Sequence, residues 1–326
     1  MKGKGPPFKD LIRYNYVLML RCMDPSDEFL SNLASVVYLT NRLSAISQHV
    51  TVDDRANALL TVLLQIPDEL QESVMNSFVA ALRNSGQDHV ANIFRGESDK
   101  VPMSLEHHEI LTKHIYQFCQ FLDPENGLLD KLVSAGVISS ADYRRIRSKT
   151  RLDIMARELI DTICRKSDET FDVWIQALNE TGQSHVAFII TGQGNSRPLS
   201  EALSAKLISQ RQFLINTMEA KNSGLVSALV TNGVYSQYDE QRVTGKYNEI
   251  DVIVNETILD LIMRKSQSSF DSFIKALKDT GQGHVAAVLQ TDVAAATSAS
   301  GKLRVFLKAS SHLIIDADIS LLNCYR

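Results

Sequence analysis

Three histidines recur in one short motif, and histidine is both a frequent general base and a common metal ligand. The motif is GQ-x-HVA, which places His89, His185 and His284 at the same position of three aligned segments. Catalysis or metal binding would need acidic or cysteine partners repeated at triad or ligand spacing beside each histidine, and the sequence shows none. We interpret the histidines as helix-start residues that bond the preceding turn or a partner helix. No catalytic residue, metal site or cofactor is expected.

The residues around each histidine predict a tight corner between two helices. The glycine of the motif tolerates the left-handed backbone that is favoured just past a helix C-terminus. The glutamine is expected to satisfy backbone groups at the corner, and the residue after it is an acceptable N-cap for the next helix. In chain order these residues are Gly86, Gln87 and Asp88; Gly182, Gln183 and Ser184; and Gly281, Gln282 and Gly283.

The motif closes three diverged copies of one unit. FVAALRNSGQDHVANIF, WIQALNETGQSHVAFII and FIKALKDTGQGHVAAVL align without gaps, and their glycines are separated by 96 and 99 residues. This spacing is that of domains, since helical solenoid repeats span roughly 34 to 47 residues. We predict tandem domains over 8–96, 105–191 and 200–291, joined by short linkers that restrict their orientation. The tail, 292–326, matches no repeat and is expected to be poorly ordered.

Helical periodicity runs through each copy. In the helix before the motif, apolar residues recur with spacings of three and four and mark a buried face. They are Met75, Phe78 and Leu82; Phe171, Trp174 and Leu178; and Phe270, Phe273 and Leu277. The second copy shows the full pattern: a helical stretch from Leu105 to Leu122, a helix closed by Gly136, a third that begins at a serine cap, and a fourth over RLDIMARELIDTICRK. With the two helices at the corner, this makes six helices.

Composition excludes several other classes of protein. The chain has 326 residues, 44% hydrophobic and 22% charged, which is ordinary for globular protein. Its net charge of −4 lacks the basic footprint of a nucleic-acid binder. The cysteines lie far apart without a CxxC pair, which favours a reducing compartment over a disulfide framework or zinc site. No run approaches 18 apolar residues, so no membrane span is expected, and the N-terminus lacks the apolar core of a signal peptide.

At this point the residues resemble the caspase recruitment domain (CARD), a six-helix member of the death-fold superfamily. The second copy carries the similarity through LLDKLVSAGVISSADYRRI, MARELIDTICRK and FDVWIQALNETGQSHVA. The third copy is similar nearly throughout, and the first only from about Asp53 onward, because LASVVYLTNRLSAISQHV departs from the pattern of the second and third helices. The resemblance implies an all-α fold, namely three tandem six-helix death-fold (CARD-like) bundles plus a C-terminal tail.

The family implies homotypic association without catalysis. The expected function is that of a cytoplasmic, non-enzymatic signalling adaptor that binds CARD-containing proteins (caspases, adaptors, receptors) in the regulation of apoptosis or innate immunity. Self-association into oligomers or filaments is also implied. Nucleic acid, membranes and small-molecule substrates are not expected as partners. The alternative is the N-terminal recruitment region, or a truncated or decoy form, of a CARD-containing caspase or RNA-sensing helicase.

Charged surfaces are the candidate binding sites, because family interfaces commonly set basic against acidic groups and such complementarity filters partners. The second copy has a basic cluster and an acidic counterpart, whereas the third copy is acidic on its fourth helix, with Glu256 in the place of Arg157. The basic residues are Arg144, Arg145, Arg147, Lys149, Arg151 and Arg157; the acidic ones are Asp123, Glu125 and Asp130, then Glu249, Glu256 and Asp260. Solvated helix faces are the competing interpretation. Reversing Arg144, Arg145 and Arg147 to Glu is expected to abolish association and leave helicity intact.

Overall fold

The computed structural model describes residues 6–290, and every regular element in this range is a helix. The expected all-α class is confirmed, and the predicted tail lies outside the described residues. The chain divides into two compact units. One comprises Met1–Pro198 with Arg264–Ser266, and the other comprises Leu199–Met263 with Gln267–Arg326. We call residues 8–96, 105–191 and 200–291 the first, second and third segments; the first unit therefore contains the first two segments.

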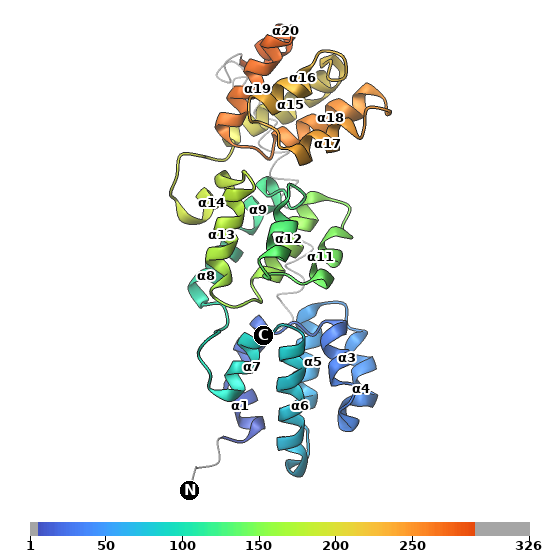
Figure 1. The fold of residues 1–326 in the computed structure, drawn as a ribbon, viewed down its shortest axis with the longest axis vertical. Helices are drawn as coiled ribbons and strands as arrows, with labels where there is room; N and C mark the ends of the chain where they lie inside the picture. The colour runs from blue at the N-terminus through green and yellow to red at the C-terminus, as the bar shows by residue number, and fades with distance from the viewer. Residues whose placement is uncertain (1–5, 291–326) are drawn as a thin grey trace, which may run out of the picture. The chain divides into compact units, whose positions relative to one another are not determined.

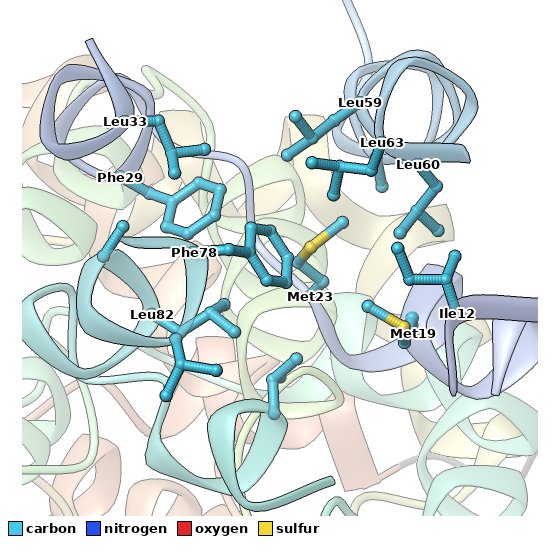
Figure 2. Packing of buried hydrophobic residues seen from close by; sticks show 14 of the residues in the cluster. Ile12, Met19, Met23, Phe29, Leu33, Leu59, Leu60, Leu63, Phe78 and Leu82 are labelled. Carbon is cyan, nitrogen blue, oxygen red and sulfur yellow. The ribbon is translucent and has the colours of Figure 1, made fainter. Parts of the chain in front are cut away.

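The first segment folds around one apolar cluster. Phe78 lies at its centre, with its ring edge-on to the rings of Phe8, Phe29 and Phe94, and Figure 2 shows Phe78 beside Phe29, Leu82 and Met23. Helices also form over the stretch that departs from the pattern of the other copies. The helices of this segment are α1 Phe8–Tyr14, α2 Tyr16–Cys22, α3 Asp27–Leu33, α4 Val37–Ser47, α5 Val52–Leu64, the 3-10 helix η1 Asp68–Leu70, α6 Gln71–Asn84 and α7 Asp88–Arg95 (Figure 1).

The second segment repeats this order with one difference from the predicted helices. The stretch predicted as one helix from Leu105 to Leu122 is broken at His114, which ends α8 and precedes α9. Ser139 begins α11 as predicted, in a capping box with Asp142. The helices are α8 Leu105–Lys113, α9 Ile115–Phe121, α10 Leu128–Ser134, α11 Ser140–Arg147, α12 Leu152–Ile163, α13 Thr170–Glu180 and α14 Ser184–Thr191.

The second unit contains the helices of the third segment. They are α15 Glu201–Thr217, α16 Leu225–Thr231, α17 Gln237–Thr244, α18 Asp251–Ile262, α19 Gln267–Asp279 and α20 Gly283–Gln290. The apolar face predicted for the helix before each motif is buried in all three segments, except that Met75 is partly buried and packs against the core of the first segment.

The corner at each motif has the predicted glycine and a different cap. Gly86, Gly182 and Gly281 have φ of 73°, 72° and 79°, a conformation that a glycine adopts without steric cost. Asp88 and Ser184 are not N-caps but the first residues of α7 and α14, whose N-caps are the preceding glutamines. The cap prediction was therefore wrong by one residue.

The glutamines satisfy backbone groups, as predicted, but far along the chain. Gln183 accepts from the amide of Asp123 at 2.8 Å and donates to the carbonyl of the same residue at 3.0 Å. Gln87 makes the same pair of bonds with Asp24. Each glutamine thereby fixes the chain just after the first long helical stretch of its segment against the corner.

The linker between the first two segments is held against the loop that follows α12. Pro102 forms an isolated β-bridge with Ser167, and the amide of Met103 donates to the carbonyl of Lys166 at 3.2 Å. Met103 is also buried. The short linker is thus part of the packed structure of the first unit.

Candidate protein interface

The predicted basic cluster lies on α11, in the loop after it and on α12. Asp142 and Ile146 are the buried residues of α11, whereas Tyr143 and Arg145 are half-buried. Arg144 and Arg147 are exposed there, and Arg157 is exposed on α12. Arg147 donates to the hydroxyl of Tyr143 at 2.6 Å, and its guanidinium lies 5.8 Å from the centre of that ring.

The other basic residues of the cluster are engaged by carboxylates. Arg145 pairs with Asp142 at 2.9 Å and with Glu158 at 3.0 Å, and Lys149 reaches Glu158 at 3.4 Å. Arg151 pairs with Asp153 at 2.7 Å. Sequence reasoning treated these residues as equivalent to Arg144, whereas in the structure Arg145 and Lys149 are half-buried in ion pairs and Arg151 is exposed beside Asp153.

Arg145 also faces the first segment. Its guanidinium lies 3.6 Å from the carboxylate of Asp24, in the loop after α2. Burial opposes the charged form of Arg145, but Asp24, Asp142 and Glu158 outweigh it and raise its pKa. Part of the predicted interface is therefore occupied inside the first unit by the chain itself.

Asp142 is the centre of this charge network. Burial alone would raise the pKa of its carboxyl, but Lys166 at 2.9 Å, the amide of Ser139 and the guanidinium of Arg145 lower it to about 2. Asp142 is thus ionised at neutral pH and fixes Arg145 and Lys166 in place.

The predicted acidic counterpart of the second segment is only partly a surface. Asp123 is buried, and Gln183 binds its backbone, so this residue does not contribute its carboxylate to an acidic surface as predicted. Asp130 is exposed and Glu125 half-buried. The hydrogen bond that Arg147 donates to the Tyr143 hydroxyl is the largest cause that raises the pKa of Arg147, and Glu125 and Asp130 also contribute. Glu125 and Asp130 are thus near enough to Arg147 to favour its charged form.

In the third segment the acidic residues are also paired. Glu256 and Asp260 lie on α18, where Arg211 of α15 binds them at 2.9 and 2.8 Å. Glu249 does not belong to this helix, which begins at Asp251, and its carbonyl accepts from Lys221. Arg157 and Glu256 occupy the same aligned position, and both are exposed. The predicted reversal of charge therefore lies at the surface.

A contact that sequence reasoning missed joins the first two segments. Arg165, in the loop after α12, donates from one nitrogen to the carbonyls of Leu20 and Met23, both at 3.1 Å. Its other nitrogen binds the carboxylate of Asp53 at 2.6 Å. In return, His89 of the first motif bonds the carbonyl of Arg165 at 2.7 Å. We call this pairing of Arg165 and His89 the arginine–histidine contact.

The first unit contains the same contact a second time. Arg264 donates to the carbonyls of Cys119 and Leu122 at 3.1 and 2.7 Å, and His185 bonds the carbonyl of Arg264 at 2.7 Å. The sequence contains a repeated tripeptide at this contact: Arg-Lys-Ser occurs at 165–167 and again at 264–266. Its role becomes clear only from the hydrogen bonds in the structure.

His89 and His185 are therefore neutral donors. Because a carbonyl can only accept, Nε2 of His89 and of His185 carries the proton. Burial lowers the pKa of both histidines to about 4, although the bonds to backbone carbonyls act in the opposite direction. The histidines were predicted to bond the preceding turn or a partner helix. His89 fits the second of these, because its Nε2 also lies 3.3 Å from the Cys22 carbonyl at the end of α2.

Residues 6–290 contain no group of three or more His, Cys, Asp or Glu side chains that could hold a metal ion. Cys22 and Cys164 are buried, and burial raises the pKa of each thiol to about 12. Within the same range no helix has both the length and the apolar character needed to cross a membrane. A cleft of about 730 Å³ borders the arginine–histidine contact and is lined by Asp24, Arg145 and Lys166 among other residues.

Two comparisons with known proteins found a similarity, and one of them gives a range within the chain. Residues 108–193 match the model of the caspase recruitment domain. A stretch of 124 residues is 27% identical to baculoviral IAP repeat-containing protein 3 of Canis lupus familiaris, and it covers 38% of this chain and 17% of that protein. Caspase recruitment domains are non-catalytic modules, and their presence points to homotypic protein interaction in apoptotic or inflammatory signalling. The comparisons thus find one caspase recruitment domain, at residues 108–193.

Proposed function

We propose that the chain is a non-enzymatic signalling adaptor whose three segments are tandem six-helix CARD-like bundles. The match over 108–193 supports this for the second segment. Two further features support it for the others: the glycine corner recurs with the same positive φ, and the motif glutamine makes the same two backbone bonds in all three segments.

The adaptor binds other CARD-containing proteins in the cytoplasm by homotypic contacts and regulates apoptosis or innate immune signalling. Similarity to baculoviral IAP repeat-containing protein 3 favours the apoptotic branch. The partners are caspases, adaptors or receptors that carry the same fold, and the chain self-associates through the same kind of surface.

The observation that carries the proposal is the exposed basic surface on the domain that matches the family. Arg144 and Arg147 project from α11, and Arg157 projects from α12. An acidic surface on a partner CARD complements them, and this charge pairing speeds encounter and discriminates between partners. Arg145 is excluded from the docking surface, because its ion pairs hold the fold together.

The test uses the full-length chain as bait. We expect the wild type to capture proteins with death-fold domains from cell lysate, and R144E/R147E to lose them. K113E is the matched control, since Lys113 is an exposed basic residue on α8, away from α11. Circular dichroism checks that all three chains keep the same helicity.

Two results contradict the proposal. One is capture of death-fold proteins by R144E/R147E at the wild-type level, which places binding elsewhere. The other is the recovery of no death-fold protein by the wild type, which removes the adaptor function.

A further inference from the structure

One pair of backbone carbonyls accepts side-chain hydrogen bonds in all three segments. The pair stands at the C-terminus of α2, α9 and α15. One carbonyl belongs to the third-last residue of the helix, and the other to the residue that follows the helix. The pairs are Leu20 and Met23, Cys119 and Leu122, and Ile215 and Met218.

These carbonyls are among the orphan acceptors that every helix leaves at its end. When such an acceptor is buried, it costs free energy unless a donor is found. In the first two segments the donor is a guanidinium, from Arg165 and from Arg264. In the third segment it is the side-chain amide of Asn255, whose Nδ2 lies 2.9 Å from the carbonyl of Ile215 and 2.6 Å from that of Met218.

The position of Asn255 is what distinguishes the segments. Asn255 lies on α18 and is almost completely buried. By the register of the buried leucines and isoleucines, the same position holds Ala156 on α12 and Ala56 on α5. Alanine has no donor, so the two segments with alanine are the ones whose carbonyls bind an arginine.

We infer that Asn255 ends the series of arginine–histidine contacts by supplying, from within the third segment, the donors that an arginine supplies to the other two. The inference rests on the part of the proposed function in which the three segments are copies of one bundle. A further copy that approached the third segment with an Arg-Lys-Ser loop would find its acceptors already bonded.

The opposite end of the series is closed as well. In the register of α5 and α12, Gln65 stands where the other segments have Arg165 and Arg264. At this position the first segment therefore has no guanidinium to donate to the carbonyl pair of another chain. Copies of the whole chain do not extend the series through this contact, and partner binding is left to other surfaces.

The test moves the asparagine into the first segment of the full-length chain. R165A removes the guanidinium from the carbonyls of Leu20 and Met23 and from the carboxylate of Asp53. We expect it to lower Tm by roughly 3 °C, the shift that a loss of about 1 kcal/mol produces in a unit of this size. A56N in the same chain should restore at least half of the loss. A56L, which adds similar volume without a donor, should restore none.

Two outcomes overturn the inference. One is a double variant A56N/R165A that is no more stable than R165A. The other is equal recovery with A56L, which would assign the effect to packing.

If the variants at position 56 fail to fold, N255A decides in their place. Ethylguanidinium at millimolar concentration should raise the Tm of both N255A and R165A and leave the wild type unchanged, with ethylammonium as the control cation. A response of R165A without a response of N255A overturns the inference. Because all of these readouts are stabilities, they do not depend on whether the chain binds CARD-containing partners.

Discussion

The neutral histidines of the first two motifs predict a loss of stability between pH 6.5 and pH 4. Burial lowers the pKa of His89 and of His185 to about 4, whereas an unfolded histidine titrates near 6.5. Between these values the unfolded chain binds the proton and the folded chain does not. The contribution of each histidine to folding is therefore complete above pH 6.5 and lost progressively as the pH falls to 4.

The magnitude follows from the same two pKa values. Holding a pKa at about 4 instead of about 6.5 corresponds to about 3 kcal/mol for each histidine. Within the first unit, protonation of His89 would also place its charge near Lys166, and His185 would face Lys265 in the same way. For a protein whose total stability is on the order of 10 kcal/mol, this is a large fraction.

Urea unfolding of the full-length chain at pH 7.0, 6.0, 5.0 and 4.5 measures the effect, and H89Q/H185Q isolates it. Carboxylates also change the stability with pH. Asp142 loses its stabilising contribution only below its unfolded pKa near 3.8. Burial raises the pKa of Asp161, so this residue favours folding more as the pH falls. We therefore compare slopes with pH. H89Q/H185Q should flatten the slope, whereas H284Q should not, because His284 is exposed. If the stability of H89Q/H185Q falls with pH as steeply as that of the wild type, the loss of stability does not come from these two histidines.

Three further predictions follow from single contacts. S139A removes the capping box of α11 and should cost about 1 kcal/mol in urea unfolding, whereas S140A, at the next position, should cost little. Q183A leaves both backbone groups of a buried loop without a donor and an acceptor, and should destabilise the chain by roughly 1 to 3 kcal/mol in the same assay. Cys22 and Cys164 should stay unmodified by iodoacetamide at pH 8 until the chain is unfolded, as peptide mass mapping would show, because each thiol has a pKa of about 12.

The buried faces could be predicted from sequence because helical period alone decides them. Phe78, Trp174 and Phe273 occupy one register position, and all three are buried without measurable exposure. The glycine corner was predictable for a similar reason, since it depends on one residue type and one backbone conformation. These features involve residues close together in the chain.

The charged surface could be predicted only in part. Arg144 and Arg145 are neighbours with the same side chain, yet one is exposed and the other bridges three carboxylates. The sequence shows the i, i+3 relation of Arg145 to Asp142, but not that Asp24 approaches from another segment. Asp123 could not be predicted for a different reason: it is buried, and its backbone is bound by Gln183, which lies 60 residues away in the sequence.

For the motif histidine, the sequence predicted the position at a helix start but not the hydrogen-bond partner. Its position at a helix start follows from the corner, but its hydrogen-bond partner lies 76 residues ahead in the first segment and 79 in the second. The residues that form the corner in the first two segments therefore also bind the arginine loop. At His284 the same helix start is exposed, and the carbonyl pair of its segment is bonded by Asn255 instead. The fold explains why the corner recurs, and the arginine–histidine contact explains why His89 and His185 lie buried.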